Sequence, residues 1–174
     1  MWIWRFNLSK SSNLFLKVNS LSFSSLNKTL ETDFLTKIIQ NERNNPLFTE
    51  ASTILEVVNE SINNNLKITP DMPSYDTALF GALLKQLQLM VHNDKYDHTG
   101  AYILLFQYIL QKVNPTVKQS AIGTIEKTLT EIIKNVPKNT IPEKYIISMY
   151  YNILQIKPPV EWFRILPLSF LTLY

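Results

Sequence analysis

The sequence predicts an all-α fold, arranged as a short right-handed helical-hairpin solenoid of about six or seven helices. Three observations support this prediction. Apolar residues recur at spacings of three and four from residue 29 onward in the 174-residue chain, which is the periodicity of amphipathic helices. Prolines and polar loops interrupt this pattern between the expected helices. Only three Gly occur, too few for the tight turns of an all-β fold.

The first three expected helices lie before residue 92. A short helix over 34–39 runs into the polar stretch 40–45. A second helix, over 54–62, is expected to end at Asn63–Asn65, because Asn competes for its own backbone hydrogen bonds. The third covers 78–91 and is followed by a polar loop. Each of these helices has one apolar stripe, so each must pack against a neighbour.

Four further helices are expected in the second half. The segment 102–113 is apolar on nearly every face, which predicts burial by neighbours on both sides. Asn114 followed by Pro115 predicts an N-cap and a first-turn proline for a long fifth helix. Thr140 and Glu143 predict a capping box for a sixth helix through residue 156. A seventh is expected from Pro158 onward.

The first 28 residues have the composition of an organellar targeting leader. They hold four basic residues and no acidic one, and serines are frequent among them. Basic, Ser-rich and acid-free segments are typical of transit peptides. We therefore expect residues 1–28 to be a targeting-like leader and residues 29–174 to be a single α-helical repeat domain, located in the mitochondrial matrix rather than in another organelle. The chain contains no apolar run of about 20 residues, so no transmembrane segment is expected.

The composition argues against an enzyme. The chain has no Cys, which excludes thiol catalysis and thiolate metal sites. It also has no Gly-rich phosphate-binding motif. Both His residues, His92 and His98, fall in one polar loop with Asp94 and Asp97, without the helical spacing of a metal-binding His pair. We interpret this loop as solvated, and we expect no catalytic residue, no metal and no cofactor.

A weak internal repeat gives the fold prediction more detail. Residues 108–117 and 152–160 both contain Ile-Leu-Gln followed by a helix-opening proline, at an offset of 43 to 44 residues. This period is typical of helical-hairpin solenoids. A plain helical bundle is the alternative, because amphipathic helices produce chance matches.

The second copy carries a resemblance to a known family. The stretch that starts at Pro142-Glu143 and ends in Pro158-Pro159-Val-Glu161-Trp162-Phe163 resembles the octotricopeptide repeat and, more loosely, the repeats of proteins that carry the RAP domain. The resemblance covers about residues 142–163 and implies an α-solenoid that acts on RNA in mitochondria or chloroplasts. The motif residues are expected to be structural: Pro159 presets the first helical turn, Glu161 complements the helix dipole and Trp162 anchors the packing.

The charge distribution indicates where RNA would bind. Residues 29–111 hold five basic and ten acidic side chains, whereas residues 112–174 hold eight and four. Basic residues near the octotricopeptide-like end are therefore candidates for contacts with RNA phosphates. These candidates are Lys118, Lys127, Lys134, Lys138, Lys144, Lys157 and Arg164.

The last residues predict a protein partner. They are strongly apolar, and the end of a solenoid needs a polar cap or a cover. The candidate interface residues are Phe163, Leu168, Phe170, Leu171 and Tyr174. Together these features favour a non-catalytic mitochondrial RNA-binding or mitoribosome-associated small subunit, with organellar ribosomal or messenger RNA and protein subunits as partners. The alternative is a structural accessory subunit of a mitochondrial complex, for example a respiratory complex, that does not touch RNA.

Overall fold

The structure, a computed structural model, describes residue 38 and residues 40–156. Every regular element in this part of the chain is a helix, as the sequence predicts. The helices with defined bounds are α4 (Phe48–Leu66), α5 (Tyr75–Asn93), α6 (Thr99–Lys112), α7 (Pro115–Asn135), α8 (Glu143–Ile147) and a π-helical continuation of α8, η2 (Ser148–Leu154). Residues 40–42 are also helical, so the first expected helix extends into the polar stretch where it was expected to end. The expected leader, the Pro158–Trp162 motif and the apolar C-terminal residues lie outside the described residues.

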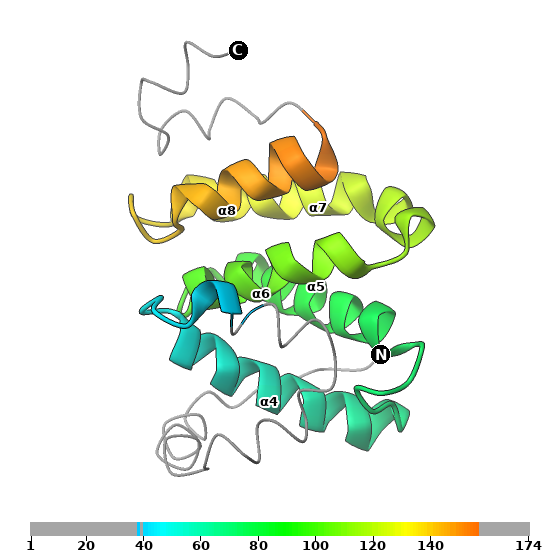
Figure 1. Cartoon of the computed structure of the whole chain (residues 1–174). Coiled ribbons are helices and arrows are strands. Elements are labelled where there is room, and N and C mark those ends of the chain that lie inside the picture. Colours follow the sequence, from blue (N-terminus) through cyan, green and yellow to red (C-terminus); the bar gives the residue numbers. More distant parts are fainter. Residues whose placement is uncertain (1–37, 39, 157–174) are drawn as a thin grey trace.

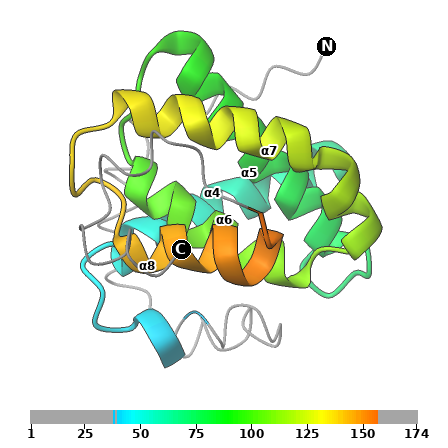
Figure 2. The ribbon, with the colours of Figure 1, turned by 90° about the horizontal axis from the view of Figure 1, so that it is seen from above.

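The helices are stacked in three levels, with α4 at one end, α5 and α6 in the middle, and α7 and α8 at the other end (Figure 1). Seen from above, α7 lies over α5, and α8 with η2 lies over α6 (Figure 2). The contacts agree, since α4 packs on α6, α6 packs on α8 and η2, and α5 packs on α7. Each helix thus packs on the helix two positions later, a neighbour pattern that stacked helical hairpins also have.

The core is centred on α6. Its residues from Thr99 to Leu110 are all buried, so the expectation of a helix covered on all faces is confirmed. The ring of Phe106 stacks on that of Phe80 of α5, with centroids 5.8 Å apart and an interplanar angle of 14°. Gly100 lets α6 approach the loop before α8 closely, because a Cβ at this position would lie 2.7 Å from the backbone oxygen of Thr140.

Two predicted helix starts have different outcomes. Asn114 caps α7 as expected: its side-chain oxygen accepts a hydrogen bond from the backbone N–H of Thr116 at 2.8 Å, and Pro115 occupies the first turn. The capping box predicted for Thr140 and Glu143 is wrong. Pro142 is the N-cap of α8 and no side chain caps it. Glu143 is consequently the first helical residue, too early in the helix to reach back as a capping box requires.

The predicted end of the second helix is also corrected. Helix α4 continues through Asn63–Asn65 to Leu66 and ends at Lys67, whose φ of 56° is left-handed. The amide of Asn65 donates to the backbone oxygen of Ser61 at 2.8 Å, so it bonds inside the helix instead of competing with it. Among the described residues, no helix combines the length and the apolar character needed to cross a membrane.

Candidate functional site

The lysines predicted to bind RNA do not all share one face of α7. Lys127 and Lys134 are seven residues apart, close to two helical turns, and both are exposed. Lys118 is nine residues before Lys127, about two and a half turns, which places it on the opposite side of the helix. That side is the buried stripe that contains Ile125 and Ile132. The structure therefore brings Lys127 and Lys134 together and separates Lys118 from them.

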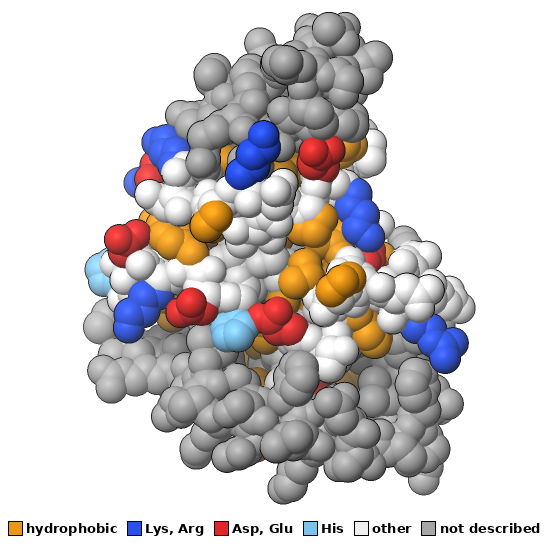
Figure 3. Space-filling model, turned by 90° about the vertical axis from the view of Figure 1, so that its left-hand side faces the viewer, with side chains coloured by type: hydrophobic (Ala, Val, Ile, Leu, Met, Phe, Trp, Pro, Cys, Tyr) orange, Lys and Arg blue, Asp and Glu red, His pale blue; other side chains and the backbone are white. Residues whose placement is uncertain are grey.

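The remaining described candidates differ in their surroundings. Lys134 forms an ion pair with Glu131, at 3.0 Å between Nζ and Oε1. Lys138 is exposed in the loop after α7. Lys144 is the second residue of α8 and pairs with Glu42. On the face drawn in Figure 3, Lys and Arg side chains are separated from one another by acidic, polar and apolar ones. Lys157 and Arg164 lie outside the described residues.

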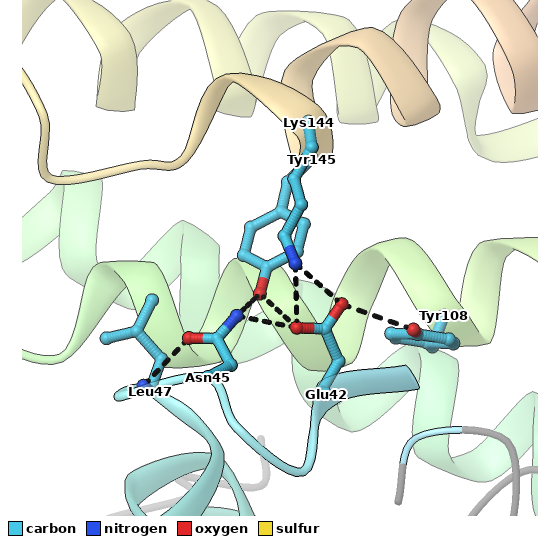
Figure 4. Close-up of polar contacts among 6 residues, drawn as sticks. All are labelled: Glu42, Asn45, Leu47, Tyr108, Lys144 and Tyr145. Carbon is cyan, nitrogen blue, oxygen red and sulfur yellow. Dashed lines mark hydrogen bonds and ion pairs between the residues drawn. The ribbon is translucent and has the colours of Figure 1, made fainter. Parts of the chain in front are cut away.

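Glu42 is the centre of a polar cluster that joins three parts of the chain. Its side chain is 6% exposed, although it lies only a few residues before α4. Lys144 Nζ contacts both carboxylate oxygens, at 2.9 and 3.0 Å. The hydroxyl of Tyr145 donates to Oε2 at 3.1 Å, and that of Tyr108 to Oε1 at 3.3 Å. Figure 4 shows these donors, from α6 and α8, converging on the carboxylate.

Asn45 completes this cluster and orders the turn that leads into α4. Its amide nitrogen donates to Glu42 Oε2 at 2.6 Å and also contacts the hydroxyl of Tyr145. Its side-chain oxygen accepts a hydrogen bond from the backbone N–H of Leu47 at 2.9 Å (Figure 4). Asn45 thus uses its donor and acceptor groups in different directions, one toward the buried carboxylate and one toward its own turn.

The electrostatics of the cluster favour an ionised Glu42. Burial alone raises the pKa of this carboxyl, but hydrogen bonds from Lys144, Asn45 and Tyr145 and the positive charge of Lys144 outweigh it, so the pKa is lowered. The pKa of Tyr145 is raised, first by burial and then by the negative charge of Glu42. The same two causes raise the pKa of Tyr108. The cluster is therefore a fixed ion pair with neutral tyrosines, and every carboxylate lone pair is occupied.

A polar hollow opens beside this cluster. It has a volume of about 380 Å³ and is formed by residues 40–46 together with Pro142 and Lys144. Apart from Pro46 and Pro142, every lining residue is polar or charged. Lys144 connects the two features, because it pairs with Glu42 and also lines the hollow.

The two histidines flank the loop between α5 and α6, so the expectation that both lie in that loop is wrong for His92, which is in the last turn of α5. His98 Nδ1 contacts Glu50 Oε1 of α4, while His92 is exposed at the end of α5. Among residue 38 and residues 40–156, no three side chains of the kinds that ligate metals come together. In this structure His98 thus joins the loop to α4.

The Glu42 cluster is the feature that sequence reasoning missed. Its partners are 66, 102 and 103 residues away, and in the sequence residues 40–45 are recognisable only as a polar stretch after the first expected helix. The only available signal was that Glu42 follows Ile38 and Ile39 by four and three residues, which is helical spacing. Comparisons with known proteins add no analogue: no family model, no curated protein and no solved structure matches the chain.

Proposed function

We propose that this chain is a non-catalytic mitochondrial helical-repeat protein that binds RNA through α7 and the loop after it, as a small subunit of a ribonucleoprotein such as the mitoribosome. The observation that carries the proposal is the outward position of Lys127 and Lys134, followed by the exposed Lys138. Lys127 and Lys134 lie on one side of α7 and Lys138 lies in the loop just beyond its end, so a phosphate backbone that follows the helix could contact all three.

The fold and the sequence support the same proposal. Packing of each helix on the one two positions later gives α7 a buried face toward α5 and leaves its other face outward. Helical-repeat proteins use such outer or concave faces to bind extended partners. The repeat-like segment from Pro142 and the basic, acid-free first 28 residues favour organellar RNA as that partner.

The test is RNA binding by the purified full chain at several salt concentrations. We expect organellar ribosomal RNA to bind at low salt. The logarithm of the binding constant should fall linearly with the logarithm of the salt concentration, and the slope of this line is the quantity to compare. The double variant Lys127→Gln/Lys138→Gln should lower the slope by about 1.4, since each phosphate contact to a single strand contributes about 0.7. The matched control, Lys67→Gln/Lys85→Gln, removes one exposed lysine just after α4 and one of α5 and should leave the slope unchanged. Equal slopes for both variants would contradict the proposal.

A specific observation favours a second candidate, a protein-only subunit of a mitochondrial complex. Lys134 and Lys144 are both paired with carboxylates, which reduces the positive charge that RNA would meet. Sedimentation of the native protein separates the two functions. Co-migration with ribosomal particles that nuclease treatment abolishes supports RNA binding. Co-migration with an inner-membrane complex that nuclease leaves intact supports the second candidate.

A further inference from the structure

The polar hollow beside Glu42 has the chemistry of a ligand site. Four of its lining residues carry carboxamides, a group that presents a hydrogen-bond donor and an acceptor side by side. These residues are Gln40, Asn41, Asn44 and Asn45. A donor next to an acceptor is also what the edge of a nucleic-acid base presents, and Asn and Gln are the side chains that pair with adenine in two hydrogen bonds. Single-stranded RNA is read through such edges.

The charges of the hollow favour a phosphate rather than a cation. Two cationic side chains, Arg43 and Lys144, line it together with one carboxylate, that of Glu42, and Arg43 also interacts with another group of the chain. Both oxygens of that carboxylate already accept hydrogen bonds from the surrounding side chains, so Glu42 has no lone pair left for a metal ion. Lys144 Nζ contacts both carboxylate oxygens of Glu42, which places this amine at the edge of the hollow. A positioned amine beside a guanidinium is a suitable pair for a phosphate group.

The size and shape of the hollow limit the ligand further. Its volume of about 380 Å³ lies at the lower end of the range of small-molecule sites. It is formed by residues 40–46, which precede α4, and by Pro142 and Lys144 at the start of α8. A nucleotide within an RNA strand needs a site between two separate wall segments, since the RNA strand must enter and leave on either side of the bound base.

We propose that this hollow binds one nucleotide of an RNA strand, with its phosphate held by Arg43 and Lys144 and its base by the carboxamides of Gln40 and Asn44. The inference rests on the proposed function for its source of ligand. It uses none of the α7 lysines, so the two proposals can fail separately.

The experiment follows the side-chain amide signals of Asn and Gln in the ¹⁵N-labelled full chain by NMR. Three probes are added in separate titrations: 5′-AMP, 5′-UMP and inorganic phosphate. We expect the nucleotides to shift the signals of Gln40 and Asn44 and to leave those of Asn63–Asn65, which are exposed at the end of α4, in place. Equal shifts in both groups would overturn the proposal. So would an inorganic phosphate titration that reproduces the whole shift, because the base would then contribute nothing.

Variants test the assigned residues. Arg43→Gln/Asn44→Ala should weaken nucleotide binding about tenfold, the loss expected for a hydrogen bond to a charged group. The matched control Asn63→Ala/Lys67→Gln removes one amide and one cation from the exposed C-terminal end of α4 and should have no effect. All four positions are exposed, so the fold should survive, and unchanged backbone spectra will verify it. Equal affinity of the two double variants would overturn the assignment.

Two further arms identify the source of the ligand and separate this site from α7. A tetranucleotide RNA should bind more tightly than 5′-UMP, and tighter binding of the free nucleotide would overturn the assignment to RNA. Lys127→Gln/Lys138→Gln should lower the RNA salt slope while the 5′-UMP shifts at Asn44 persist. A lowered slope without any nucleotide shift would refute the hollow and leave the proposed function standing. Nucleotide shifts together with an unchanged salt slope would support the hollow and refute RNA binding by the α7 lysines.

Discussion

Helices α6 and α7 follow each other in the chain, yet they are built in opposite ways. Twelve of the 14 residues of α6 are buried, whereas α7 buries five of its 21. Helix α6 contacts α4, α5, α8 and η2, while α7 packs mainly on α5. Helix α6 therefore contributes most to the packing of the stack, whereas α7 has an exposed face that is available to the proposed partner.

The largest expected effect is the loss of a large side chain from α6. Phe106 is fully buried and stacks on Phe80, so Phe106→Ala should lower the free energy of unfolding by about 3–5 kcal/mol. The comparison variant on α7 is Val117→Ala, at a partly buried position, which should cost less than about 1 kcal/mol. Urea denaturation followed by circular dichroism measures both. Similar losses would mean that the two helices contribute equally to the core.

The second prediction concerns the polar attachment of α6 and α8 to the segment before α4. Glu42→Gln removes the buried charge that Tyr108, Tyr145 and Lys144 contact. We expect the free energy of unfolding to fall by about 2 kcal/mol, less than the roughly 3–5 kcal/mol for breaking a fully buried ion pair, because Lys144 is half-exposed and regains water. The matched control is Glu60→Gln, an exposed carboxylate of α4, which should change stability by less than about 0.5 kcal/mol.

The same variant has a pH signature. The pKa of Glu42 is lowered from 4.5 in the folded chain. Its stabilisation is therefore complete well above pH 4.5 and is lost as the pH falls through the folded pKa. The difference in unfolding free energy between the wild type and Glu42→Gln should shrink as the pH is lowered from about 6 toward about 3. A difference that stays constant over this range would show that Glu42 acts through packing alone.

The smallest expected effects have opposite signs in the two helices. In α6, Gly100→Ala would place a Cβ 2.7 Å from the backbone oxygen of Thr140, and the necessary backbone shift should cost about 1–2 kcal/mol. In α7, a Cβ at Gly123 meets nothing within 4 Å. Gly123→Ala should therefore stabilise the chain by about 0.5–1 kcal/mol, through the higher helix propensity of Ala. Thermal melts give the sign of the change in melting temperature for each variant. An increase for both variants would contradict the close approach at Gly100.

Local patterns were sufficient to predict most of the helices. The apolar run 102–113 predicted the buried α6, and Asn114-Pro115 predicted the cap of α7, because these signals depend on residues within one helical turn. The predicted capping box at Thr140 failed since Pro142 already provides a preset start for α8. The predicted stop at Asn63–Asn65 failed because the Asn65 amide found a partner inside the helix.

The candidate sites were harder to predict than the helices. Helical spacing alone separates Lys118 from Lys127 and Lys134, and a helical wheel would have shown it. The pairing of Glu42 with Lys144 depends on how α8 lies over α6 and on where the turn before α4 runs, and no pattern within a single helix carries that information. The same holds for the polar hollow, whose walls come from residues 40–46 and from Pro142 and Lys144.

The long separation between Glu42 and its partners also orders events during synthesis. Lys144 leaves the ribosome 102 residues after Glu42, so α4, α5 and α6 can associate long before the carboxylate finds its cation. Closing so long a loop is entropically costly until the helices between have folded. We therefore expect the segment before α4 to dock last, and to be the first part of the folded chain whose backbone amides exchange with solvent.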